Sequence, residues 1–175
     1  GDLSMAQTYR ALSVLLSYPT AETAAAIPAA VEALDQERLA APGLVRRLTS
    51  LAFDLSQQDL YEAQARYVDL FDRTRSLSLQ LYEHVHGESR GRGQAMVDLA
   101  MVYEKGGLTL SANELPDYLP LFLEYLSTLP IDEARSVLGD AMHIISTVEG
   151  RLAARESPYA AVFSAIRSAA GADAV

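Results

Sequence analysis

Apolar residues recur with the 3.6-residue period of an α-helix along almost the whole chain. The clearest stripes are Met5, Tyr9, Leu12 and Leu16; Leu44, Leu48, Leu51 and Leu55; Leu60, Ala63, Tyr67, Leu70 and Phe71; Met96, Leu99, Ala100 and Tyr103; Ala134, Leu138, Ile145 and Leu152; and Tyr159, Val162, Phe163 and Ile166. The segment Tyr118–Thr128 is apolar nearly all round, which predicts burial on several sides. The pattern predicts an all-α fold, a single domain over residues 1–175 built as a bundle of about seven to nine helices.

Polar residues and prolines between the stripes predict where helices begin. Pro28 is expected to start or kink the second helix, and Pro42 to occupy the first position of the third. Asp132 is expected to start one long helix that continues to about Leu152. The expected capping residues are Thr20, Asp59 (in a capping box with Glu62), Asp117, Asp132 and Ser157.

The stretch from Leu77 to Ala100 departs from the helical pattern. Leu77, Leu79 and Leu81 alternate with polar residues, as in a strand, but no other segment alternates and could pair with it. We therefore interpret it as an irregular segment that leads to a short helical turn near residues 82–86. The glycines that follow (Gly87, Gly91 and Gly93) predict a loop before the next helix.

The charge balance narrows the class of partner. The chain has 23 acidic and 14 basic residues and a net charge of −9, which argues against a nucleic-acid-binding protein and favours basic partners. It has no cysteine, no apolar run of about 18 residues, and no N-terminal pattern of a secretion signal. We expect a cytoplasmic protein that does not enter the membrane.

Two histidines and two arginines are the main candidates for chemistry. His84 and His86 lie two residues apart, a spacing that on a helix turns their side chains ~200° apart, so local hydrogen bonding is favoured over a metal site. Arg90 and Arg92 precede a predicted helix and could meet an anion there, but solvated side chains or pairs with Glu88 are the simpler interpretation. We expect no metal or other cofactor.

No catalytic arrangement stands out beside these residues. The sequence has neither a nucleophile elbow nor a glycine-rich phosphate loop with its lysine. The spacing of its carboxylates does not indicate acid–base catalysis. The residues alone therefore indicate a binding module rather than an enzyme.

Two short motifs and the segment between them indicate a family. Tyr67-Val68-Asp69-Leu70-Phe71 and Glu114-Leu115-Pro116-Asp117-Tyr118 together resemble motifs of the twin-arginine redox-enzyme maturation chaperones, the TorD/DmsD/NarJ group. The segment from Arg75 to Leu99, with its Glu-His-Val-His-Gly-Glu-Ser-Arg-Gly-Arg-Gly core, is similar to the NarJ branch, the assembly chaperones of respiratory nitrate reductase. The resemblance covers about Tyr67 to Leu129.

This resemblance implies a non-catalytic role. Such a chaperone binds the N-terminal segment of the apo catalytic subunit and keeps it competent for molybdenum cofactor insertion and membrane assembly. A monomer is favoured. The residues expected at the client surface are Tyr67, Leu70, Phe71, His84, His86, Glu88, Arg90, Arg92, Glu114, Pro116, Asp117 and Tyr118.

Several alternatives stay open at this point. Asp117 could be only a helix cap, and Phe71 only a core residue. The client could be another molybdoenzyme with a leader peptide. An all-α metalloenzyme that uses His84 and His86 is the remaining alternative.

Overall fold

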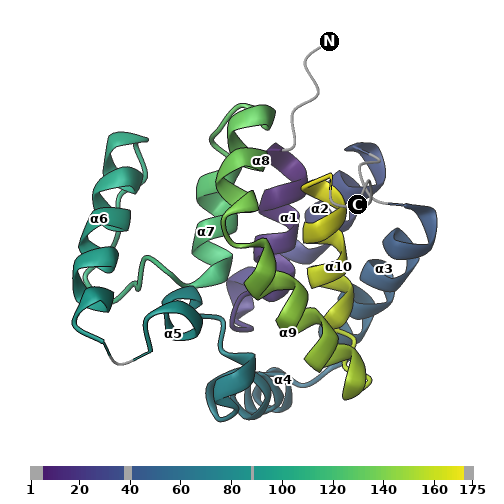
Figure 1. Ribbon diagram of the computed structural model, residues 1–175. Helices are drawn as coiled ribbons and strands as arrows, with labels where there is room; N and C mark the ends of the chain where they lie inside the picture. The colour runs from purple at the N-terminus through teal and green to yellow at the C-terminus, as the bar shows by residue number, and fades with distance from the viewer. Residues whose placement is uncertain (1–5, 38–40, 88, 172–175) are drawn as a thin grey trace.

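The computed structural model describes residues 6–37, 41–87 and 89–171, which form ten α-helices, one π-helical turn and one 3-10 turn (Figure 1). The helices are α1 (Ala6–Leu16), α2 (Ala21–Glu37), α3 (Pro42–Gln57), α4 (Leu60–Tyr67), α5 (Leu81–Val85), α6 (Gly91–Lys105), α7 (Leu119–Leu126), α8 (Ile131–Gly139), α9 (Met142–Ala154) and α10 (Ala160–Ala169). The π turn η1 spans Val68–Asp72 and the 3-10 turn η2 spans Arg75–Leu77. The all-α prediction is confirmed, and no strand longer than a single bridge occurs in these described residues.

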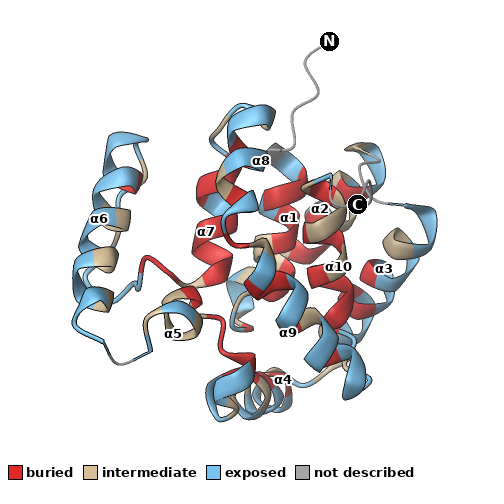
Figure 2. Ribbon diagram, in the orientation of Figure 1, coloured by how far each residue is buried: buried red, intermediate tan, exposed pale blue. Residues whose placement is uncertain are grey.

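The centre of the bundle is α1. It packs against α2, α7 and α10, and Tyr9, Leu12 and Leu15 on it are completely buried (Figure 2). Every residue of α7 except Glu124 is buried, as its all-round apolar sequence predicts. Each fully buried leucine on these helices contributes about 1.5–3 kcal/mol relative to an exposed one.

Two of the predicted helix starts are confirmed. Thr20 caps α2 reciprocally with Thr23: the Thr23 N–H donates to Thr20 Oγ1 over 3.1 Å, and the Thr20 N–H donates to Thr23 Oγ1 over 2.8 Å. Pro42 is the first residue of α3.

Other boundary predictions are wrong. Pro28 lies inside α2 and does not start it, because Thr20 already caps the helix about two turns upstream; that Pro28 kinks the helix stays a prediction. Asp59 precedes α4 but makes no side-chain capping bond. Asp132 lies within the first turn of α8, after Pro130. The long helix expected from Asp132 breaks at residues 140–141 into α8 and α9.

The helix α6 stands apart from the bundle, between α5 and the loop that leads to α7 (Figure 1). Gly91 and Gly93 belong to its first turn, so the loop predicted there is shorter than expected. Only Tyr103 on α6 is buried, whereas Val97, Met101 and Val102 are about half exposed. No helix among residues 6–37, 41–87 and 89–171 is long and apolar enough to cross a membrane.

Candidate functional site

The two motifs meet at a pair of tyrosine hydroxyl groups. Tyr67 is buried at the end of α4, and its hydroxyl donates to the Leu16 carbonyl over 2.7 Å. Since that bond uses its only proton, the Tyr118 hydroxyl, 2.5 Å away, must donate to Tyr67. Tyr118 in turn accepts the Tyr18 N–H over 3.1 Å. The chain of bonds fixes the end of α1, the end of α4 and the start of α7 to one another.

Aromatic rings pack around Tyr67 and bury the two aromatic residues of the first motif. The π turn after α4 carries Phe71 back toward Tyr67, with ring centroids 4.9 Å apart, and Tyr159 stacks edge-on against Phe71 at 5.1 Å. Tyr67 and Phe71 are each only 2% exposed, and burial raises the pKa of the Tyr67 hydroxyl. Leu70 is half-buried and lines a small cavity beside Pro158. The core interpretation therefore fits Phe71.

Asp117 caps a helix, but a different one from that predicted. The residue before α7 is Tyr118, and Asp117 instead accepts the Tyr82 N–H of α5 on Oδ2 over 3.0 Å. Asp117 reaches α5 because the chain from Leu79 to Tyr82 runs alongside Asp117 and Leu119. The Leu81 N–H donates to the Asp117 carbonyl and the Leu119 N–H donates to the Leu79 carbonyl, at 3.0 and 2.8 Å.

The Asp117 carboxyl group is completely buried behind this backbone pairing. Its Oδ1 has no hydrogen-bond partner among the described residues, and burial raises the pKa of the carboxyl above its ordinary value, although the Tyr82 N–H opposes the rise. Pro116 is buried beside it, and its carbonyl accepts the Tyr103 hydroxyl over 2.8 Å. Pro116 and Asp117 therefore tie α5 and α6 to the bundle and offer no accessible surface in this conformation.

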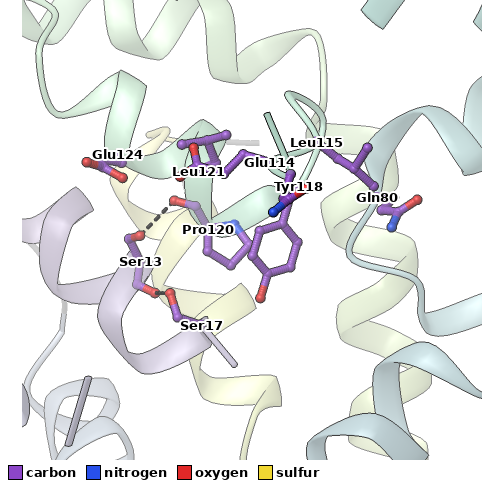
Figure 3. A pocket seen from close by; sticks show the side chains of 10 residues that line it. Ser13, Ser17, Gln80, Glu114, Leu115, Tyr118, Pro120, Leu121 and Glu124 are labelled. Carbon is purple, nitrogen blue, oxygen red and sulfur yellow. Dashed lines mark hydrogen bonds between the residues drawn. The ribbon is translucent and has the colours of Figure 1, made fainter. Parts of the chain in front are cut away.

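Glu114 and Tyr118 differ from these buried motif residues because they line an open groove of about 370 Å³ (Figure 3). Pro120 and Leu121 of α7 form its apolar floor, and the exposed Leu115 lies at its edge. The other lining residues are Ser13, Ser17, Gln80, Asn113 and Glu124. The Ser13 hydroxyl donates to the Pro120 carbonyl over 2.7 Å, which holds α1 against α7 at the base of the groove.

The charge of this groove follows from two exposed carboxylates. Glu114 comes from the loop before α7 and Glu124 from α7 itself, and none of the described residues that line the groove is basic. An acidic rim around an apolar floor fits a ligand that combines an apolar side chain with a positive charge.

The residues of the histidine-rich segment lie on α5 and at the start of α6. His84 donates through Nε2 to the Ser78 carbonyl over 2.8 Å, which is the local hydrogen bond favoured by the sequence, and His86 stacks edge-on against Tyr82. Among the described residues, no group of three or more His, Cys, Asp or Glu side chains could hold a metal ion.

The two arginines of this segment differ in their contacts. Arg90 is exposed immediately before α6. Arg92 lies in the first turn of α6, donates to Gln80 Oε1 over 3.0 Å and pairs with Glu83 at 3.6 Å. Glu88, the partner expected from sequence, lies outside the described residues.

The client surface expected from sequence did not include eight residues of the groove: Ser13, Ser17, Gln80, Asn113, Leu115, Pro120, Leu121 and Glu124. Ser13 lies in the last turn of α1 and Ser17 directly follows that helix, and no motif marks either residue. The only available signal was the isolated Glu124 in the otherwise apolar helix α7, because a charge there must face solvent or a polar partner.

Comparison with known proteins decides the family. Residues 20–165 match the family described as nitrate reductase delta subunit. The chain belongs to this family. The resemblance to the NarJ branch is thereby confirmed.

Individual relatives carry consistent names. NarW of Escherichia coli K12, named as a probable nitrate reductase molybdenum cofactor assembly chaperone, is 44% identical over 169 residues, which are 94% of this chain and 68% of NarW. NarJ of the same organism, a nitrate reductase molybdenum cofactor assembly chaperone, is 56% identical over 110 residues, or 63% of this chain and 47% of NarJ. A Bacillus subtilis protein, named as a probable chaperone of this kind, is 32% identical over 93% of this chain and 87% of its own length.

The fold also has a solved counterpart. A crystal structure described as a redox enzyme maturation protein from Archaeoglobus fulgidus superposes with a TM-score of 0.65 at 24% identity, over 93% of this chain and 91% of that one. At this identity the likeness concerns the fold alone. The named relatives are assembly chaperones, so the family is one of chaperones and not of catalysts.

Proposed function

We propose that this chain is a dedicated chaperone for the catalytic subunit of a respiratory nitrate reductase. It binds the N-terminal segment of the apo subunit in the cytoplasm and keeps that subunit competent for molybdenum cofactor insertion before membrane assembly. It acts as a monomer. The names of the relatives support the client, and the acidic groove beside Tyr118 supports the mode of binding.

The groove is the observation that carries the binding mode. A volume of about 370 Å³ accommodates one or two side chains of a peptide. An amphipathic client segment would place an apolar side chain against Pro120 and Leu121, and a neighbouring arginine or lysine near Glu114 and Glu124. The net charge of −9 would accelerate capture of such a basic segment.

The buried motif residues then support the groove rather than contact the client. Tyr67, Phe71, Pro116 and Asp117 hold Tyr118 and the preceding loop in position. Substituting them would test folding as much as binding. The informative substitutions are therefore at exposed positions.

Titration calorimetry with a synthetic peptide tests the proposal. The peptide copies the first ~15–20 residues of the nitrate reductase catalytic subunit from the same genome, and a scrambled peptide and the leader of another molybdoenzyme serve as controls. We expect saturable binding of the first peptide only, about fivefold weaker in Leu115→Ala. The matched control is Phe53→Ala, because Phe53 is also an exposed apolar residue but lies on α3.

Two results would contradict this assignment. The groove is excluded if Leu115→Ala and Phe53→Ala bind the peptide as tightly as the parent protein. The choice of client is excluded if the leader of the other molybdoenzyme binds more tightly.

A further inference from the structure

A second cavity, of about 540 Å³, carries the opposite charge from the groove. It is lined by Arg75, Ser76, Glu83, Gly87, Arg92 and Arg151. These residues come from the 3-10 turn η2, from α5 and the turn after it, from α6, and from α9. We call it the arginine pocket. Three guanidinium groups and one carboxylate surround it, in a chain that has 23 acidic and only 14 basic residues.

Hydrogen bonds within the protein position the guanidinium groups of Arg151 and Arg92. Arg151 Nη1 donates to the Ser76 carbonyl over 2.7 Å, which ties α9 to η2. Arg92 Nη2 donates to Gln80 Oε1 over 3.0 Å and lies 3.6 Å from Glu83 Oε1. Each of these contacts uses a single nitrogen of a side chain that has five N–H donors, so both forks keep donors for a ligand.

We propose that the arginine pocket binds a phosphate-bearing small molecule. Guanidinium groups bind phosphate oxygens in pairs of parallel hydrogen bonds, and three of them match a tetrahedral dianion better than the two oxygens of a carboxylate. The volume suits a ligand up to the size of a nucleotide. A protein of net charge −9 does not suit the long polyanionic backbone of a nucleic acid.

Glu83 sets the affinity of this pocket. In the described part of the chain, its carboxylate is the only negative group that lines the pocket. This carboxylate forms an ion pair with Arg92. A bound phosphate competes with Glu83 for that guanidinium. The pocket has no lining residue in common with the client groove, and its occupancy can be measured without any client peptide.

Calorimetric titration with pyrophosphate tests the proposal, at constant ionic strength in a buffer without phosphate. We expect saturable binding at one site per chain, weaker but measurable binding of inorganic phosphate, and none of chloride. Citrate, a small polycarboxylate, serves to distinguish a preference for phosphate from a general affinity for anions. The phosphate assignment is overturned if citrate binds as tightly as pyrophosphate, and the site itself is overturned if pyrophosphate does not saturate.

Three variants locate the site. Arg151→Gln and Arg75→Gln should each weaken pyrophosphate binding about tenfold, because each removes a charged donor. Glu83→Gln should tighten it severalfold, a gain that a misfolded variant would not show. Arg155→Gln, at an exposed position immediately after α9, should leave binding unchanged. Equal losses in Arg151→Gln and Arg155→Gln, or weaker binding in Glu83→Gln, would overturn the assignment to this pocket.

Discussion

Arg92 Nη2 lies 3.0 Å from Gln80 Oε1, and this hydrogen bond joins the acidic groove to the arginine pocket. Gln80 lines the groove and Arg92 lines the pocket. The two cavities have opposite charges, yet one side-chain contact is shared between them. A ligand that draws Arg92 away from Gln80 therefore changes the wall of the groove, and by linkage an occupant of the groove changes the affinity of the pocket.

A double-mutant cycle measures the strength of this contact. Gln80→Met and Arg92→Met, singly and together, should show a coupling energy of about 0.5–1 kcal/mol in urea unfolding, the value of a partly exposed hydrogen bond. The control cycle pairs Arg92→Met with Gln36→Met, an exposed residue on α2. A coupling no larger than that of the control pair would show that the bond contributes nothing to stability.

The Tyr67–Tyr118 hydroxyl pair should contribute measurably to stability. Tyr118→Phe removes the proton that Tyr118 donates to Tyr67 and the oxygen that accepts the Tyr18 N–H. The expected loss is about 1–2 kcal/mol of unfolding free energy, measured by urea titration. Tyr61→Phe is the matched control. Because Tyr61 is 80% exposed, removing its hydroxyl group should leave the unfolding free energy unchanged. Equal stabilities of the two variants would contradict the bonding scheme.

Asp117 should make stability depend on pH. Burial raises the pKa of its carboxyl in the folded state, so the folded protein binds the proton more tightly than the unfolded chain. The corresponding stability is fully present below the ordinary pKa of about 3.9 and is lost as pH rises through the folded value. The unfolding free energy of the parent protein should therefore fall, relative to Asp117→Asn, as pH rises from 4 toward neutrality. Urea titrations across this range check the sign, and a constant or rising difference would contradict it.

Two glycines should respond in opposite directions to alanine. A Cβ at Gly150, within α9, meets no atom within 4 Å, so Gly150→Ala should stabilise the protein by about 0.5–1 kcal/mol. Gly107 has a φ of +88°, and Gly107→Ala should destabilise by about 1–2 kcal/mol. Thermal unfolding of both variants measures the contrast. A loss of stability in Gly150→Ala would mean that α9 is not regular at that position.

The periodic apolar stripes predicted the bundle because burial is decided by local spacing. Leu12, Leu48 and Tyr103 are buried where the pattern placed them. The helix ends were harder to predict, because a cap depends on geometry that the sequence does not contain. Asp117 is the clearest case: its residue type predicted a cap, but the helix it caps comes 35 positions earlier in the chain.

The candidate site was only partly predictable for the same reason. The motifs identified Glu114 and Tyr118, which line the groove, together with Tyr67 and Asp117, which the structure places behind it. Motifs do not distinguish the two roles, since supporting and contacting residues lie within one or two positions of each other. Arg75 and Arg151 could not be grouped from sequence, because only the packing of α9 beside η2 brings them to one cavity.

Residues 79–82 pair with residues 117–119, so α5 and α6 lie in a long loop of the chain whose two ends meet at this pairing. The exposed residues Gly106 and Gly107, at the end of α6, lie within this loop. Helix α1, which precedes the loop, packs against α7 and α10, which follow it. Cutting the peptide bond there would separate the chain into two pieces that still share one apolar core. The two halves, expressed as independent fragments, should therefore reassemble into the native bundle by complementation.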